Sequence, residues 1–440
     1  MNDTQTPDTL LQAYETAQAP APAGPAWLHA LRTQGFDAYR ESGLPTIRNE
    51  EWRYTSVSPI AKISWRVAPQ EFGSRLRPLD IARFLPAGLD VPRLVFINGR
   101  LVTRLSTQGR LAAGLHFLGL REALESKGPS ARVVQAHLAR HAEIEGDAFT
   151  ALNTAFFENG AFIHVQRGLG FDQPVQVLHL TVAGDQPVVA QPRALIILDE
   201  SSRANVIEIF AGLGAPARFA NSVSEMIVGE NAHLEHSLVQ FEDDLAYHVG
   251  TQRVRVDRNG SLTSRCFALG AALARNNLHC VLNGEGAQAT LGGLFMGRGS
   301  QHVDEHVHVE HSKPHGTSRQ LYRGVLDGAS HGVFSGKVVV RPDAQKTDAQ
   351  QTNNNLLLSD DARIDTKPQL EIYADDVKCA HGATSGRLNE EALFFLRSRG
   401  LGEREARALL TYAFAAELIE TVEPQALREA LSGLVQARLT

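Results

Sequence analysis

A short unit recurs through the middle of the chain and constrains its fold more than any other feature of the sequence. Each unit has an apolar residue, a small polar turn containing Asp, Gly, Glu or Asn, and a second apolar strand. The units begin at Leu198, Val228, Val256, Leu282, Leu326 and Leu358, at steps of 30, 28, 26, 44 and 32 residues. This period is typical of solenoids, and the 44-residue step would hold an extra coil or an insertion.

No helix-length periodic segment interrupts these units. Strands that follow one another without crossover helices cannot form a doubly wound sheet, but they can stack coil on coil as a parallel β-helix. The expected fold class is therefore mainly β. A sandwich of hairpins is the alternative, and the scarcity of two-residue hairpin signals disfavours it.

The sequence divides into four regions. Residues 1–25 include an Ala-Pro-Gly stretch that cannot hold a helix, so this N-terminal segment is expected to be mobile. Residues 26–150 form a mixed α/β region with a hairpin predicted at Asn98-Gly99, because Asn-Gly tolerates the positive φ angles of a tight turn. Residues 151–388 are assigned to the β-helix core, and residues 389–440 to a helical domain.

The C-terminal domain has strong helical patterns. Asn389 is expected to cap a first helix, and a long amphipathic helix is expected from Glu403 to Val422. Its apolar stripe is formed by Ala406, Leu410, Phe414 and Leu418, with Leu409 and Ala413 beside them. Such helices can close the end of a solenoid or present a surface to a partner.

Composition excludes several classes of protein. Forty-three Lys and Arg against 49 Asp and Glu leave a net charge of −6, too acidic for a protein whose main function is to neutralise nucleic-acid phosphates. Only three cysteines occur, widely spaced, which favours the reducing cytoplasm over a disulfide framework. We find no secretory signal and no uninterrupted run of ~20 apolar residues, so no membrane association is expected.

The common catalytic motifs are absent from the sequence. Gly336-Lys337 lacks the upstream glycine and the following hydroxyl of a phosphate-binding loop, so the chain is not expected to hydrolyse nucleotide itself. G-x-S-x-G, H-E-x-x-H and paired C-x-x-C motifs are also missing, and no enzymatic activity is predicted. Carboxylates along a solenoid groove leave a polysaccharide-active β-helix enzyme as an alternative.

Histidine is dense between residues 302 and 315. Strand alternation would place Val303, Val307 and Val309 on one face, and on the other His302, Asp304, His306, His308 and Glu310. The favoured interpretation is a solvated outer face over a valine-lined core, because metal sites usually converge from several segments. His302, His306 and His308 are candidate ligands for a transient transition metal, and a metal-storage or metal-sensing protein is a further alternative.

The stretch VKCAHGAT carries a sharper pattern, because Cys379 and His381 would lie on the same side of a strand, about 6.6 to 6.8 Å apart at Cα. Thiolate and imidazole suit iron, zinc or sulfur-bearing intermediates. Two ligands do not complete a tetrahedral site, so the remaining ligands would come from another chain or binding would be temporary. The alternative is an inert buried cysteine beside a hydrogen-bonded histidine. Cys266 and Cys280 are expected in the core.

The segment LLLSDDARIDTKPQLEIYADDVKCAHGATSGRLNEEALFFLRSRGL resembles the SufB/SufD family of iron–sulfur cluster assembly proteins. The resemblance continues upstream through AQKTDAQQTNNN to GLPTIRNEEWRYT, and covers most of the chain from about residue 40 onward. Chain size, the KCAHGAT version of the motif and the absence of any cysteine before Cys266 favour the SufD branch over SufB. Ala380 stands where many SufD sequences have Ser.

The resemblance implies a right-handed parallel β-helix flanked by helical N- and C-terminal regions. It also implies a scaffold subunit without ATPase activity, which pairs with SufB and binds the ATPase SufC through its C-terminal helical domain. Cys379 and His381 would lie where the two β-helices meet, with His381 the more direct ligand. A nascent iron–sulfur cluster or iron would be held there transiently, with no tightly bound cofactor. Without SufB, the chain is expected to form a homodimer.

Overall fold

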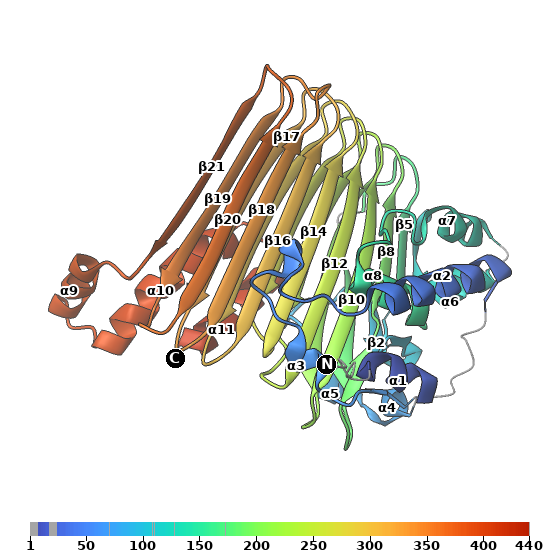
Figure 1. Ribbon diagram of the computed structural model, residues 1–440, viewed down its shortest axis with the longest axis horizontal. Helices are drawn as coiled ribbons and strands as arrows, with labels where there is room; N and C mark the ends of the chain where they lie inside the picture. The colour runs from blue at the N-terminus through green and yellow to red at the C-terminus, as the bar shows by residue number, and fades with distance from the viewer. Residues whose placement is uncertain are drawn as a thin grey trace, which may run out of the picture.

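The computed structural model describes residues 8–16 and 24–439, apart from residues 70, 108, 110, 127 and 172. Its main body is a stack of parallel strands that alternate between two sheets, so each coil places one strand in each sheet (Figure 1). Strands make up 40% of the described residues and helices 26%, and the solenoid has about eight turns. The expected mainly β class and the parallel β-helix are therefore confirmed.

The two sheets share one pattern of parallel pairing along the solenoid. From edge to edge, the first sheet contains β20 (Arg363–Ile372), β18 (His331–Val340), β16 (His302–His311), β14 (Leu273–Leu282), β12 (Ala246–Val256), β10 (Arg218–Val228), β8 (Arg193–Leu198), β5 (Ala161–Val165) and β4 (Leu115–Gly119), with β7 (Val188–Ala190) beside β10 and β1 (Arg66–Val67) beside β7. The second sheet contains β21 (Lys378–Gly386), β19 (Asp348–Leu357), β17 (Thr317–Leu326), β15 (Gln288–Gly297), β13 (Ser261–Ala268), β11 (His233–Gln240), β9 (Arg203–Leu213), β6 (Val175–Val182), β2 (Arg93–Ile97) and β3 (Arg100–Leu101). The pairs β4–β5 and β2–β3 are antiparallel.

The sequence repeat corresponds to one coil for its first three steps. The first four starting residues end β8, β10, β12 and β14, and they pair with one another across the first sheet. The 44-residue step is neither an insertion nor a whole extra coil. Leu282 pairs with His311 on β16, 29 residues on, and Leu326 ends β17 in the second sheet. The step therefore holds one coil and a half, because Leu282 ends a strand of the first sheet and Leu326 ends a strand of the second.

The polar turn of each of the first four units carries the chain from the first sheet to the second. Asn231 (φ 55°), Asn259 (φ 50°) and Gly286 (φ 69°) take the left-handed conformation in three successive turns. Asn and Gly adopt this conformation at lower cost than other residues. The Asn259 side-chain amide also donates to the Asn231 side-chain oxygen at 3.3 Å. The small polar residues of the repeat are therefore a requirement of the turn.

Alternate side chains fill the space between the two sheets, here called the lumen, with a continuous apolar core. Val303, Val307 and Val309 of β16 belong to this core. The alternation predicted for residues 302–310 is thus confirmed on its apolar side. This core extends to Phe334 of β18, and a separate small cluster of Val338, Val340, Ala344, Ala349 and Ala374 lies in the last coils.

Helices and short segments of the N-terminal region cover the first coils. α2 (Ala26–Ser42) packs on α8 (Ala148–Phe156), and α8 packs on β10 and β12. The other elements are α1 (Thr9–Thr16), η1 (Glu50–Trp52), α3 (Ser58–Ala61), α4 (Phe72–Arg75), α5 (Pro78–Ala82), η2 (Thr103–Leu105), α6 (Leu120–Glu125) and α7 (Pro129–His137). The hairpin predicted at Asn98-Gly99 is confirmed, with φ angles of 52° and 77° between β2 and β3.

The prediction of a mobile N-terminal segment falls largely on residues that the structure does not describe. Residues 1–7 and 17–23 lie outside the described part of the chain, and α1 lies between them with Leu10 buried. The boundaries of the four regions stay predictions. None of the described helices is long and apolar enough to cross a membrane.

The C-terminal helices are α9 (Glu390–Ser398), α10 (Glu403–Ile419) and α11 (Gln425–Leu439). Asn389 caps α9 as expected, because its side chain accepts from the Ala392 N–H at 3.0 Å. α10 and α11 share an apolar core with the outer face of the second sheet. The predicted stripe of α10 is partly wrong, because Leu409 and Ala413 are exposed. The main column is largely confirmed, because Ala406 and Leu418 are buried and Leu410 and Phe414 are partly buried. The residues buried beside this column are Thr411, Ala415 and Ile419.

A buried ion pair within the solenoid also holds part of the N-terminal region. Arg193 on β8 donates to Glu225 on β10, and neither side chain has exposed surface. The Glu225 carboxylate also accepts from the N–H groups of Ala139 (2.8 Å), His141 (3.1 Å) and Ala142 (3.2 Å). Because a buried charge needs such partners, this contact fixes the segment after α7 against the first coils.

Removing one partner of the Arg193–Glu225 pair is expected to destabilise the protein strongly. Arg193→Met leaves a buried, uncompensated carboxylate, so the free energy of unfolding should fall by about 3 to 5 kcal/mol in urea denaturation. The matched control is Arg167→Met, because Arg167 pairs with Glu200 while 74% of its side chain is exposed. The free energy of unfolding of this control should fall by less than about 1 kcal/mol. An equal fall in the free energy of unfolding for the two variants would contradict the stabilising role of the buried Arg193–Glu225 pair.

Candidate functional site

The solenoid finishes in two strands that are paired on one side only. β20 ends the first sheet beside β18, and β21 ends the second sheet beside β19. Most residues of β21 are exposed, in contrast to the buried strands of the preceding coils. Figure 1 shows β21 at the outer edge of the stack, near the C-terminal helices. We call this terminus, formed by β20 and β21, the open end.

Cys379 and His381 lie on the open end, two residues apart on β21. Cys379 is in register with Ala349, and His381 with Gln351, on the preceding strand β19. Ala349 and Gln351 are both buried. The two potential ligands therefore continue rows of buried side chains into the last coil, where Cys379 is half-buried and His381 is exposed. As predicted, both lie on the same side of a strand.

The Cys379 thiol is held in its protonated form at neutral pH. Burial raises its pKa above the ordinary cysteine value, and the nearby Asp348 carboxylate acts in the same direction. A cysteine must lose its proton to bind a metal ion. Cys379 can therefore become a ligand only when a metal ion or a positive group from another molecule stabilises the thiolate.

The two side chains do not form a complete metal site on their own. Within the part of the chain that the structure describes, no third His, Cys, Asp or Glu joins them as a potential ligand. A tetrahedral site needs four ligands. What this arrangement offers chemically is a thiol and an imidazole at an exposed edge, open to ligands from another molecule.

The His-rich strand β16 is covered in part by residues 50–55, here called the strap, which lie across the first sheet (Figure 1). Thr55 Oγ1 lies 2.8 Å from Nε2 of His302. Glu51 Oε2 lies 3.5 Å from Nδ1 of His306. The interpretation of this strand as a solvated outer face is therefore wrong here, because a distant segment of the sequence folds back onto it.

Asp304 is buried beneath the strap and has a structural role. Its Oδ2 atom accepts from Arg275 at 2.9 Å, and its Oδ1 atom lies 3.2 Å from His306. Burial alone would raise the pKa of Asp304, but His306 and Arg275 hold that pKa well below the ordinary range. The Arg275 guanidinium also lies 3.8 Å from the ring centroid of Trp52 in the strap. These contacts fasten the strap to the first sheet.

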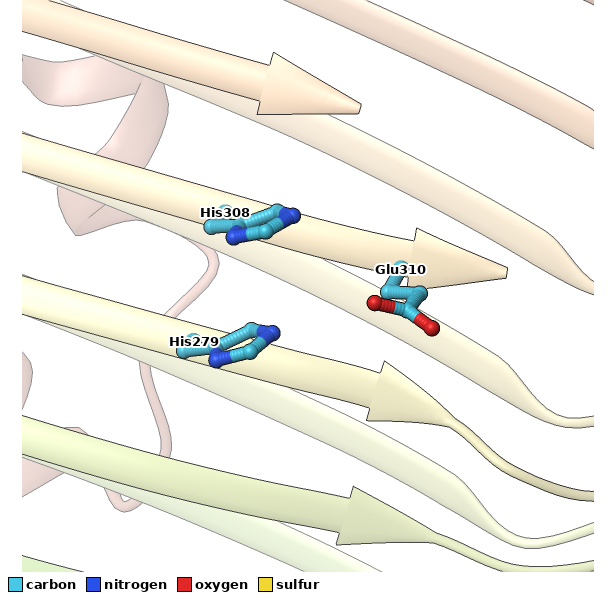
Figure 2. A group of neighbouring side chains, drawn as sticks. All are labelled: His279, His308 and Glu310. Atoms are coloured by element: carbon cyan, nitrogen blue, oxygen red, sulfur yellow. The ribbon is translucent and has the colours of Figure 1, made fainter. Parts of the chain in front are cut away.

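The three candidate histidines of β16 are not brought together. His302 and His306 contact the strap, whereas His308 pairs in register with His279 on β14. Figure 2 shows His279 and His308 with their rings side by side, next to Glu310. Sequence reasoning missed His279. The signal was available, because His279 precedes His308 by 29 residues, which is one coil.

The other two cysteines are buried in the solenoid, as predicted. Burial raises the pKa of Cys280 to about 12 and that of Cys266 well above its ordinary range. Glu305, which faces the same lumen, has its pKa raised to about 8 by burial. Its carboxyl oxygen accepts from Asn276 at 2.8 Å and lies 3.7 Å from the Cys266 sulfur. These groups are neutral at pH 7 and are shielded from water.

The last feature of this end of the molecule is the exposed apolar surface of α9. Phe394 is 73% exposed and Phe395 55% exposed, whereas Leu393 beside them is buried. Figure 1 shows α9 extending away from the solenoid, beyond α10. Two adjacent exposed aromatic side chains are unusual on a free surface and are typical of a docking site.

Comparisons with known proteins give one consistent result. The family described as "SUF system FeS cluster assembly, SufBD core domain" matches residues 180–414, and "SufBD protein N-terminal region" matches residues 5–177. The iron–sulfur cluster assembly protein SufD of Escherichia coli K12 is 34% identical over 405 residues, 90% of each chain. A SufBD family protein of Synechocystis is 32% identical over 407 residues, 90% of this chain and 87% of the relative. The chloroplastic protein ABCI7 of Arabidopsis thaliana is 27% identical over 442 residues, 98% of this chain and 90% of the relative.

The three thiols are expected to differ in reactivity. In the native chain at pH 7.5, iodoacetamide should modify Cys379 slowly and leave Cys266 and Cys280 unmodified, because only Cys379 is partly exposed. The rate should still rise above pH 9, since the thiolate is the reactive form and burial raises the pKa of Cys379. Mass spectrometry of tryptic peptides measures which cysteines are modified and how the rate changes with pH, with Cys379→Ser as the control. A rate that levels off below pH 8 would contradict the raised pKa.

Proposed function

This chain belongs to the SufBD family of iron–sulfur cluster assembly proteins, on its SufD branch, and we propose that it acts as a scaffold subunit without turnover of its own. In this role it supplies part of a site for a nascent cluster, and a SufB subunit supplies the rest. The observation that carries the proposal is the open end, where Cys379 and the exposed His381 lie together on the last strand. Family membership favours this function over a polysaccharide-active enzyme.

Pairing with SufB is proposed to occur at the open end. The free edges of β20 and β21 present unpaired backbone N–H and C=O groups, which can pair with strands of another chain. A subunit of the same family has coils of matching geometry, so it can continue both sheets at once. When SufB is absent, a second copy of this chain can occupy the same edges, which supports a homodimer as the alternative state.

The chemistry of the two side chains supports transient binding of iron or a nascent cluster. His381 is exposed and can reach a partner directly, whereas Cys379 must first lose a proton that burial helps to retain. The thiolate is therefore favoured only while iron or a group from SufB is present. This dependence supports a site that releases its cargo, rather than a tightly bound cofactor.

The C-terminal helical domain is proposed to bind the ATPase SufC. The exposed Phe394 and Phe395 of α9 offer the apolar surface for docking, while α10 and α11 share a core with the second sheet. Nucleotide hydrolysis in this arrangement belongs to SufC. We also propose the cytoplasm as the location, because Cys266, Cys280 and Cys379 are all free thiols.

Replacing His381 should separate cluster assembly from complex formation. In a complex with SufB and SufC, His381→Ala is expected to lower bound iron and sulfide to about a tenth or less, as loss of a metal ligand should cost at least as much as loss of a supporting group. Copurification of the three subunits should not change. The matched control is His233→Ala, an exposed histidine on β11 of the same sheet. Unchanged iron and sulfide would remove His381 from the site.

The docking role of α9 can be tested separately. The double variant Phe394→Ala, Phe395→Ala should weaken SufC binding by about 2 kcal/mol or more, because exposed aromatic side chains dominate the energy of such contacts. Calorimetric titration with SufC measures the affinity, and circular dichroism checks that the fold is retained. Leu79→Ala is the control, since Leu79 is 77% exposed at the other end of the chain. Equal affinity of the double variant and the wild type would place the SufC contact elsewhere.

A further inference from the structure

We propose that this chain has a second site, separate from the open end, that binds a divalent first-row transition metal through His279, His308 and Glu310. One potential ligand atom of each residue lies within 4.8 Å of the other two. Two imidazoles and one carboxylate are the ligand set of many non-haem ferrous sites, and imidazole also suits zinc, copper and nickel. The three residues lie on the outer face of the first sheet, so the site does not share the lumen or the open end.

The parallel register of the solenoid brings the ligands together. His279 on β14 and His308 on β16 are paired directly, and Glu310 lies two residues further along β16 on the same side. The two rings stack with their centroids 4.3 Å apart and their planes 5° from parallel. Figure 2 shows the Glu310 carboxylate beside the stacked rings, with one nitrogen of each ring on its side. Two neighbouring strands of a rigid sheet therefore hold all three ligands.

Only small side-chain rotations are needed to close the site around an ion. At metal–nitrogen distances of about 2.0 to 2.1 Å, two ligand atoms of one ion lie roughly 3 to 3.4 Å apart. The present separations, within 4.8 Å, exceed this by at most about 1.4 to 1.8 Å. A cavity of about 300 Å³ borders His279 and His308, so the rings have room to tilt and an ion has a path to reach them.

Both imidazoles are available as ligands at neutral pH. Burial, followed by the neighbouring ring, lowers the pKa of His279 to about 3, and burial followed by Lys337 lowers that of His308. Neutral rings have a nitrogen lone pair to offer. The Nε2 atoms of both rings are buried and have no hydrogen-bond partner among the described residues. An unpartnered buried polar atom is costly, and a ligand that engages these rings would offset that cost.

The positive charges around the site are each matched by a carboxylate. Arg341 pairs with Glu310 itself, with Nε–Oε1 and Nη2–Oε2 distances of 2.8 and 2.9 Å. Lys337 pairs with Glu371 at 2.8 Å, and Arg253 with Asp147 at 3.1 Å.

A bound cation must therefore compete with Arg341 for the carboxylate, although each carboxylate oxygen has more than one lone pair. Half of the Arg341 side chain is exposed, so it can swing away. This competition predicts reversible rather than permanent binding.

The test uses the full-length, untagged chain carrying Cys379→Ser and His381→Ala, so that ions at the open end do not contribute. Equilibrium dialysis against Co²⁺, and anaerobically against Fe²⁺, should give one ion per chain. Adding His279→Ala and His308→Ala should weaken binding by at least about a hundredfold, because two of the three ligands are lost. Glu310→Gln should weaken it about tenfold by removing the anionic ligand.

Two further variants make the test specific. Arg341→Gln should bind the ion on the order of tenfold more tightly, because it removes a competing positive charge and frees the carboxylate. The matched control is His302→Ala with His331→Ala. These two rings are also neighbours across β16 and β18, with centroids 4.7 Å apart. They have other partners, because His302 contacts Thr55 and His331 contacts Asp365.

Affinity in the control should equal that of the parent chain. No stoichiometric binding, binding unaffected by loss of His279 and His308, or binding lost in the control would each overturn the proposal. The proposed function stands apart from this result, because cluster assembly is read from iron and sulfide in the complex with SufB and SufC.

Discussion

Each coil of this solenoid depends on the next one, because a parallel strand finds its backbone partners only on the strands of neighbouring coils. The same stacking buries apolar side chains of successive coils against one another in the lumen. Inside the stack, each strand has backbone partners and buried contacts on both sides. β20 and β21 lack both on one side, because each has a neighbour on one side only. The candidate cluster site lies at this point, so its incompleteness follows from the architecture.

The repeat predicted the architecture because each coil repeats the same apolar and polar positions. The hairpin at Asn98-Gly99 and the cap at Asn389 were predictable for a similar reason, since both depend on local backbone chemistry. The pair formed by Cys379 and His381 was visible as strand alternation within five residues of sequence. These side chains end a row of buried residues, but that position follows from the register between β19 and β21. The repeat alone did not predict this register.

What the sequence did not reveal depends on contacts between distant segments. The strap covers part of β16 through Glu51 and Thr55, about 250 residues away in the chain, and no local pattern encodes that contact. His279 was missed because the pattern within one strand does not include the offset of one coil that sets this residue beside His308. The flank of the α10 stripe was predicted wrongly for a related reason, because the sheet beneath the helix determines which residues beside the main column are buried.

The position of Cys379 and His381 on the terminal coil also has a dynamic consequence. In a stack where stability is shared between nearest neighbours, the last member lacks half of its contacts and unfolds locally more often than the interior. Fraying would begin at β20 and β21, and amide hydrogens there would exchange with solvent before those of the central coils. A subunit bound to that end would suppress fraying, so the order of the ligand pair would be coupled to assembly of the complex.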